Sequence, residues 1–441
     1  MKTFKIGGIH PKDHKLAAED PSEILPIPKE VILMVNQHLG APSQVLVQKG
    51  DKIKVGQVLT SNDAFLGSVV HASVSGTVKK IGEYVDASAY YKPAIFIDVE
   101  GDEWMENIDR SIELNKQIVA EPIQIIEKIK EMGIVGLGGA CFPTHVKLNI
   151  PKGEHAEFLL VNGVECEPYL TDDYRLMMEK SEEILVGIQI LKKALGVNVA
   201  KVGIEKNKPL AIARLTQLST QYEGIEIVPL QMKYPQGAEK QLIKALTGRE
   251  VPSGQLPIRV GCVVDNVATC FAVYEAVQKN KPLIERLVTL TGPSLARAKN
   301  YWARIGTPIP SLIEAAGGMP ESIGKILAGG PMMGKALYSE DFSVSKGTSA
   351  ILLVPDGKAH RREVSNCFHC GRCVEACPMG LEPYLISAAT EHALYDRVEA
   401  AKVMDCIECG CCQYSCPANR YLLDALRMGK NKVGQIIRAR K

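Results

Sequence analysis

Two cysteine runs near the C-terminal end have the spacing of iron–sulfur ligands. The pattern C-x2-C-x2-C-x3-C-P begins at Cys367 and is repeated from Cys406. In two-cluster ferredoxins, three cysteines of each run hold one [4Fe-4S] cluster and the fourth ligates the other cluster. Structural zinc sites more often use paired C-x2-C elements, and disulfides would be expected to be denser in the rest of the chain. The runs therefore predict two clusters, with zinc and disulfides as the alternatives.

The predicted ligands are Cys367, Cys370, Cys373 and Cys416 for the first cluster and Cys406, Cys409, Cys412 and Cys377 for the second. Cys411 falls inside the second run but out of register, so we expect it to be unligated.

A glycine-rich loop, GIVGLGGACFPTHVK over residues 133–147, could approach a phosphate group. Glycines let backbone N–H groups come close to an anion because no Cβ intervenes, and Lys147 adds a positive charge at the same end. The loop is neither G-x-G-x-x-G nor a P-loop, so a tight structural turn is its commoner meaning when it is taken alone.

The segments around this loop alternate between helix and strand. Residues 121–285 read as helices separated by short apolar strands, which predicts a largely parallel sheet covered by helices. Ligands of such sheets bind at the carboxyl ends of the strands, where a polar cluster at 162–168 follows the apolar run 157–162. We therefore expect the loop and this cluster to form one site.

The remaining segments predict three smaller units. Residues 31–100 show short strands with glycine turns, typical of a small β-barrel or sandwich, and their order resembles lipoyl and biotinyl carriers. The individual strands predicted are 45–47, 52–55, 57–59 and 76–78. Phe65 stands where such carriers have their modified lysine, so a docking barrel is the favoured interpretation. Residues 286–355 read as a β-rich unit with one helix, and the spacing of apolar residues in 382–403 predicts an α-helical cluster module. We expect Leu422–Met428 to form its closing helix.

Composition limits the classes of function. The 441 residues suffice for about three or four domains, and the net charge of +2 gives no electrostatic argument for nucleic-acid binding. Nine of the 13 cysteines lie in the terminal module, and the four scattered ones suggest reduced, cytosolic thiols. Neither a signal peptide nor an apolar run of about 18 residues is evident, so we expect a protein that is soluble or peripheral to a membrane.

These pieces together resemble the C subunits of the Rnf electron-transport complexes. The resemblance extends from Gly7–Pro11 to the second cysteine run and includes Val70–Gly76, Gly136–Thr144 and Gly329–Gly334. It implies a multidomain α/β protein. Its domains would be a barrel-sandwich hybrid at 1–115, a Rossmann-like FMN/NADH domain at 116–285, a β-grasp (SLBB-like) domain at 286–358 and an α-helical two-cluster ferredoxin domain at 359–441.

The middle of the chain also resembles the FMN- and NADH-binding subunit of respiratory complex I, through four motifs that recur in order. By that resemblance the FMN site comprises Gly136, Gly138, Gly139, Lys147, Asn162, Glu165, Tyr234, Gly237, Glu239, Asn266 and Thr269. The implied contacts to the nicotinamide nucleotide are Phe142, Glu165 and Glu167.

The motifs are not identical to the family's. Leu137 replaces the loop arginine, Val164 an aspartate, Ala238 the first of two glutamates and Asp265 an asparagine. Losing carboxylates and an amide could retune the flavin potential or weaken NADH binding. Outside the resemblance, Glu165 and Glu167 could be surface carboxylates, Tyr234 a packing residue and Asn266 a helix cap.

The resemblance implies an electron-transfer subunit of a ferredoxin:NAD oxidoreductase complex that is coupled to ion transport, with NAD(H), FMN and two [4Fe-4S] clusters. The implied partners are the other membrane and peripheral Rnf subunits and, indirectly, ferredoxin, at the cytoplasmic face of the membrane. One alternative is a soluble relative that serves another enzyme, such as a cobalamin reductase or a proline-reductase electron donor. Another is a non-enzymatic, cluster-carrying scaffold with an empty flavin fold.

Overall fold

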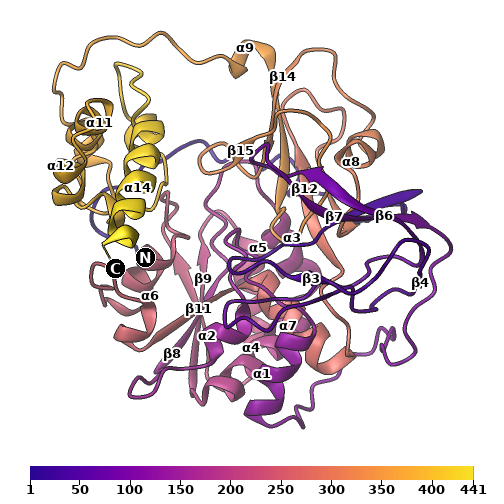
Figure 1. Ribbon diagram of the computed structural model, residues 1–441. Coiled ribbons are helices and arrows are strands. Elements are labelled where there is room, and N and C mark those ends of the chain that lie inside the picture. Colours follow the sequence, from indigo (N-terminus) through magenta and orange to yellow (C-terminus); the bar gives the residue numbers. More distant parts are fainter. Residues whose placement is uncertain (441) are drawn as a thin grey trace.

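The computed structural model describes residues 1–440, so Lys441 lies outside the described part of the chain. A four-stranded, fully parallel sheet lies at its centre in the order β10-β9-β8-β11 (Figure 1). Its strands are β8 (Phe158–Asn162), β9 (Val199–Glu205), β10 (Ile225–Leu230) and β11 (Cys262–Asn266). The parallel sheet predicted for this region is present.

Helices cover both faces of the parallel sheet. In β8, Leu159 and Val161 join one buried cluster and Leu160 joins another, because successive side chains of a strand point to opposite faces. The helices of the first cluster are α1 (Pro122–Glu131), α2 (Thr144–Leu148), α3 (Asp172–Glu179), α4 (Ser181–Leu195), α5 (Pro209–Ser219) and α7 (Val267–Lys279). On the other face lies α6 (Glu239–Thr247), followed by the 3-10 turn Pro257–Val260.

A small β domain packs beside the parallel sheet. Its larger sheet has the order β2-β7-β6-β4, and its buried residues Val31, Leu33 and Val78 belong to the same apolar cluster as α4 and α7. The strands are β2 (Glu30–Met34), β3 (Gln44–Val45), β4 (Lys52–Ile53), β5 (Thr60–Ser61), β6 (Gly76–Val85) and β7 (Tyr91–Val99). Strands β2 and β7 were not among the individual strands predicted; β2 is a continuous apolar run, which periodicity alone cannot assign.

A six-stranded mixed sheet follows, in the order β1-β13-β12-β16-β14-β15. Its edge strand β1 (Glu23–Ile24) comes from near the start of the chain and pairs with β13. The other elements are β12 (Glu285–Thr291), β13 (Lys299–Arg304), α8 (Ile309–Ala315), β14 (Ile323–Ala328), β15 (Lys335–Ala336), β16 (Ala350–Pro355) and α9 (Asp356–Ala359).

The cysteine runs lie in a helical module that a long, extended stretch after α9 connects to the mixed sheet (Figure 1). Residues 361–370 of this stretch are all exposed. The predicted helical stretch 382–403 is interrupted, because Ala393 adopts a positive φ of 55° and α11 ends before it. The module contains α10 (Arg372–Glu375), α11 (Pro383–Glu391), α12 (Tyr395–Ala400), the 3-10 turn Val403–Asp405, α13 (Cys411–Tyr414) and α14 (Leu422–Ala439).

Helix α14 continues well past Met428, where the closing helix was expected to end. Within residues 1–440, none of the helices combines the length and the apolar composition that crossing a membrane requires.

Candidate functional site

The two cysteine runs fold into matching loops. In the first, His369 and Gly371 have φ values of 54° and 78°, and in the second, Glu408 and Gly410 have values of 56° and 77°. The glycines stand directly before the short helices α10 and α13, where a left-handed conformation favours a residue without Cβ. The same backbone geometry is therefore built twice, as a repeated ligand pattern requires.

The structure gathers the cysteines across the two runs. Burial raises the pKa of Cys412, and the neighbouring Cys409, Cys406 and Cys377 raise it further. Burial likewise raises the pKa of Cys373, with a further contribution from Cys416. Cys377 thus lies with the thiols of the second run and Cys416 with the first, which is the arrangement that cross-ligation requires.

The two groups of thiols differ in exposure. Cys377, Cys406, Cys409 and Cys412 are all buried, whereas Cys367 and Cys370 are exposed. Within the described residues, no three His, Cys, Asp or Glu side chains lie close enough to hold a single metal ion. In a cubane cluster each thiolate bonds a different iron, so four cysteines per group are the donor set that such a cluster needs.

The glycine-rich loop lies at the carboxyl ends of β8 and β11. Asn162 and Asn266 are the last residues of these strands and are register partners. The side chain of Asn266 caps α7 by accepting a hydrogen bond from the Ala268 amide at 2.7 Å, and Thr269 Oγ1 accepts one from the Leu137 amide at 3.0 Å. These bonds hold the loop beside the N-terminus of α7.

This position suits an anionic group. Gly138 and Gly139 are exposed, and a Cβ at Gly139, whose φ is 108°, would meet no atom within 4 Å. The unpaired N–H groups and the dipole at the N-terminus of a helix favour a negative charge. An open, side-chain-free cradle at the start of α7 fits the phosphate end of FMN.

Charged groups line the same strand ends. Lys147 Nζ donates to the Val264 carbonyl at 2.7 Å and lies 3.4 Å from Asp265 Oδ1. Asp265 is buried, and its second carboxyl oxygen has no hydrogen-bond partner among the described residues. Burial raises the pKa of Glu239, which Lys147 lowers in part and Asp265 raises further. An orphaned, buried carboxyl oxygen is typical of a site that awaits a polar ligand.

Asn162 and Gly237 are brought together by a direct contact. Asn162 Nδ2 donates to the Gly237 carbonyl at 2.9 Å, and the Gly237 amide donates to Cys166 Sγ at 3.3 Å. Phe142, which is half-buried, closes the glycine-rich loop, since its carbonyl accepts from the Gly136 amide at 2.8 Å. The FMN residues inferred from the sequence thus surround one set of strand ends.

The two carboxylates proposed for nicotinamide contact are engaged by the protein itself. Glu165 Oε1 accepts from the Asp173 and Tyr174 amides at 2.8 and 3.2 Å, at the start of α3. Glu167 accepts from the Met332 and Met333 amides at 3.2 and 2.7 Å, and burial raises its pKa to about 7. Their role in nucleotide binding stays a prediction.

Tyr234 connects the strand ends to the buried cysteines. Its side chain is 2% exposed, and its hydroxyl donates to the Cys409 carbonyl at 2.9 Å. Its backbone pairs with Ile9, through bonds of 2.8 and 2.9 Å, so the start of the chain enters this contact as well. Three segments that are far apart in the sequence therefore meet at Tyr234.

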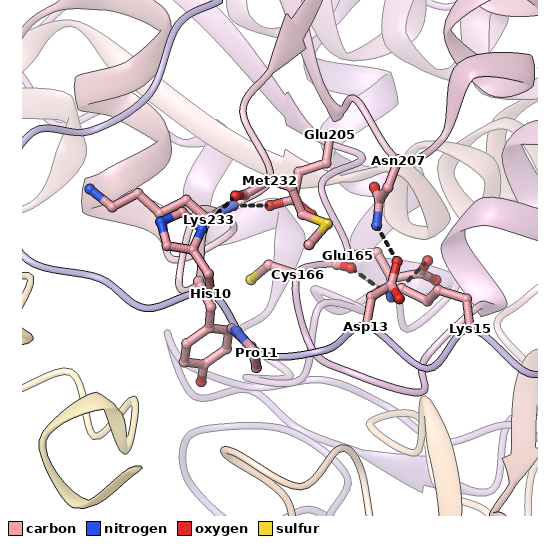
Figure 2. Close-up of a pocket in the computed structure, with 11 residues that line it drawn as sticks. His10, Pro11, Asp13, Lys15, Glu165, Cys166, Glu205, Asn207, Met232 and Lys233 are labelled. Carbon is pink, nitrogen blue, oxygen red and sulfur yellow. Dashed lines mark hydrogen bonds and ion pairs between the residues drawn. The ribbon is translucent and has the colours of Figure 1, made fainter. Parts of the chain in front are cut away.

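A cavity of about 10 Å³ lies beneath the N-terminal segment, beside this junction (Figure 2). Such a volume holds about one water molecule and no nucleotide. Figure 2 shows Lys15 and Asp13 of that segment facing Glu165 and Asn207. Neither Lys15 nor Asp13 was among the predicted site residues. The adjacent glycines Gly7 and Gly8 were the only feature of the sequence that could have indicated a close approach of this segment to the rest of the protein.

Four family models match consecutive parts of the chain. They are the RnfC barrel sandwich hybrid domain over residues 2–102, the Nuo51 FMN-binding domain over 129–275, the SLBB domain over 287–336 and the 4Fe-4S dicluster domain over 359–417. These matches confirm the predicted order of fold types and the prediction of FMN and [4Fe-4S] clusters as cofactors.

Curated relatives are similar to this chain over most of its length, and each is named as the C subunit of an ion-translocating oxidoreductase complex. That of the proton-translocating ferredoxin:NAD(+) oxidoreductase complex of Clostridium ljungdahlii is 45% identical over 90% of this chain and 87% of its own length. That of the Na(+)-translocating complex of Acetobacterium woodii is 42% identical over 98% of this chain and 97% of its own. That of the ion-translocating oxidoreductase complex of Rhodobacter capsulatus is 40% identical over 99% and 84%.

Proposed function

The chain belongs to the family of C subunits of ion-translocating ferredoxin:NAD(+) oxidoreductase complexes. On that premise we propose which of its residues hold FMN and which connect the flavin site to the clusters. It is an electron-transfer subunit that passes electrons between NAD(H), FMN and two [4Fe-4S] clusters, within a complex that couples the transfer to ion transport. The similarity to these relatives confirms the family resemblance inferred from the sequence.

The observation that carries the proposal is the contact of Tyr234 with Cys409. Tyr234 follows β10 and lies beside Gly237, which Asn162 holds at the end of β8, so it belongs to the candidate flavin site. The same side chain donates a hydrogen bond to a residue of the buried cysteine group. A flavin-type site and a cluster site are therefore immediate neighbours.

Residues at the glycine-rich loop and at the strand ends are suited to hold FMN. The exposed glycines beside α7 would receive the phosphate of FMN, and Lys147 would face the same site from the strand ends. FMN, when bound, supplies the conversion between two-electron hydride chemistry and one-electron transfer. We infer no protein general base, because the cofactors carry the chemistry and the protein positions them.

The exposure of the cysteines supports an order for the two clusters. Cys377, Cys406, Cys409 and Cys412 are buried, and Cys409 of this group contacts Tyr234, whereas Cys367 and Cys370 of the other group are exposed. The buried cluster would be the one next to the flavin, and the exposed cluster would face the redox partner. Solvent exposure and hydrogen bonds are also the features that set cluster potentials.

The relatives' names identify components of larger oxidoreductase complexes. We propose that this chain likewise assembles with membrane and peripheral subunits of its complex, at the cytoplasmic face of the membrane, and meets ferredoxin only through them. Co-purification tests this: a tagged chain should retain membrane-embedded subunits after detergent extraction. Recovery of the tagged chain with only a soluble enzyme would favour the alternative of a soluble reductase.

The test of the redox function is an anaerobic purification followed by chemical analysis and an NADH titration. We expect about eight iron and eight sulfide per chain, as two cubane clusters require, together with one FMN. NADH should bleach the flavin absorbance. Protein that holds FMN while NADH leaves it oxidised would remove the nucleotide from the proposal, and protein without flavin would favour the scaffold alternative.

A further inference from the structure

The first 18 residues, called the strap from here on, lie between the parallel-sheet domain and the cluster module. Lys2 forms a parallel bridge with Leu230 at the end of β10, and Ile9 forms an antiparallel bridge with Tyr234. Between these two bridges, the Gly8 amide donates to the Ala376 carbonyl of the cluster module at 3.0 Å. One extended segment thus holds both bodies at once.

Gly7 makes the closest approach to the cluster module. Its φ is 63°, and a Cβ at this position would overlap the carbonyl group of Cys377 and lie 2.7 Å from the nitrogen of Pro378. These neighbours are backbone atoms of a cluster loop, which cannot rotate away as a flexible side chain would. A glycine is therefore required where the strap crosses Cys377, a predicted cluster ligand.

An apolar contact lies beside this crossing. Ile9 of the strap is buried together with Tyr234, Ala376, Cys409 and Cys411. This apolar contact is small, and it contains residues of the strap, of the sheet domain and of both cysteine runs. Its burial links the position of the strap to the position of the buried cysteine group.

Lys15 fixes the other end of the strap. Its Nζ donates to the carbonyls of Glu165, Glu167 and Leu170 at 2.9, 3.0 and 2.6 Å, and it lies 3.6 Å from the Glu165 carboxylate. Hydrogen bonds from an ammonium group are stronger than those between neutral groups. The strap is therefore anchored on the loop that follows β8, which carries the candidate nucleotide residues.

The other contacts to the cluster module are few. The chain reaches it through the exposed stretch 361–370. Besides the bond from Tyr234 to Cys409, Gln241 donates to the Pro378 carbonyl and to Met379 Sδ, both at 3.2 Å, and Ser253 donates to Asp405 at 2.6 Å. Met332 packs on the apolar contact around Ile9. Because this connection is exposed, the position of the cluster module depends on its contacts with the rest of the protein.

We propose that the strap is an intramolecular clamp that docks the cluster module onto the candidate flavin site, and that Gly7 is its positioning residue. That electrons pass between the docked parts rests on the proposed function. The docking itself does not. Undocking would separate Tyr234 from Cys409 and lengthen the path between the two sites.

The test compares Gly7→Ala with Gly196→Ala in the full-length, anaerobically purified holoprotein. Gly196 has a nearly identical φ of 67° but no atom within 4 Å of its Cβ position, so it reproduces the backbone strain without the collision. The primary measurement is hydrogen–deuterium exchange in residues 230–239, which belong to the sheet domain. Iron content and flavin reduction by NADH are measured on the same samples.

We expect exchange in residues 230–239 and 374–380 of Gly7→Ala to rise roughly tenfold, equivalent to about 1.4 kcal/mol of local stability. Gly196→Ala should match the unmodified protein there. The iron–sulfur centres of Gly7→Ala should also accept or return electrons more slowly, while NADH still bleaches its flavin at the normal rate.

Equal exchange in the two variants overturns the proposal, including the case in which Gly7→Ala has lost iron. The Gln231 and Tyr234 amides donate to the Lys2 and Ile9 carbonyls, so residues 230–239 report release of the strap without requiring an intact module. If NADH fails to bleach the flavin of the unmodified protein, the proposed redox function is wrong, and the exchange comparison still decides whether the strap docks the module.

Discussion

The cross-ligation of the clusters can be tested by removing one cysteine from each run. Cys377 belongs to the first run in sequence but lies with Cys406, Cys409 and Cys412 in space. Cys377→Ala is therefore expected to abolish the buried cluster that three cysteines of the second run hold, and to leave the exposed one intact.

The expected magnitude follows from counting ligands. Each cubane contains four iron, so Cys377→Ala should retain about four of about eight iron per chain. Adding Cys406→Ala should cost no further iron, because both residues serve the same cluster. Adding Cys367→Ala instead should remove the remaining four. The non-additivity of the first pair and the additivity of the second identify which cysteines share a cluster.

The assay is iron and sulfide analysis together with EPR of the dithionite-reduced protein. Cys411→Ala is the matched control, since Cys411 is buried in the second run but out of register, and it should keep about eight iron. If Cys377→Ala with Cys406→Ala has lost all iron while Cys377→Ala with Cys367→Ala keeps about four, each run holds its own cluster and the assignment is refuted.

Three further outcomes are expected. Tyr234→Phe should weaken docking of the cluster module by about 1–3 kcal/mol, because it leaves the buried Cys409 carbonyl without its donor; hydrogen exchange in residues 405–412 measures this. Tyr301→Phe, which deletes the hydroxyl of another buried tyrosine, should not change those residues. Gly139→Val, at a φ of 108°, should lower the FMN content of purified protein, and full flavin occupancy would exclude the loop from the site. Burial raises the pKa of Glu167 to about 7, so the folded state binds the proton more tightly than the unfolded state. The contribution of Glu167 to the free energy of unfolding should be fully present below pH 4.5 and should be lost as the pH rises through 7. Glu167→Gln should flatten that part of the denaturation-versus-pH curve, and an unchanged curve would contradict the shift.

The local parts of this architecture were predictable because their determinants lie close together in the sequence. The cysteine spacing predicts which thiols hold each cluster, and the structure builds matching turns at Gly371 and Gly410. The alternation of helix and strand from 121 to 285 likewise predicted a parallel sheet. The structure places the strand ends at Asn162 and Asn266 side by side.

The partners of the candidate site could not be predicted in the same way. Glu165 and Lys15 are 150 residues apart, and Tyr234 and Cys409 are 175 residues apart, so no spacing pattern joins them. A predicted contact of Glu165 or Glu167 with a nucleotide drew on motif resemblance, which does not reveal that backbone amides already occupy these carboxylates.

Secondary structure differed from expectation where tertiary contacts decide. Apolar spacing continues through residues 382–403, but the positive φ of Ala393 ends the first helix. Conversely, α14 continues to Ala439 because Val433 is fully buried against the module core, beyond the apolar stretch that predicted a closing helix. The backbone conformation at Ala393 thus ends one helix early, and the packing of Val433 accompanies the extension of the other.

The central claim is that the buried cluster stands between the flavin and the exposed cluster. Dithionite-reduced protein, freed of excess dithionite, is mixed with excess NAD(+), rapidly frozen and examined by EPR. In Cys367→Ala, which retains the buried cluster, that cluster should be reoxidised. In Cys377→Ala, which retains the exposed one, the cluster should stay reduced although the flavin reacts. Reoxidation in Cys377→Ala but not in Cys367→Ala would contradict the proposed order.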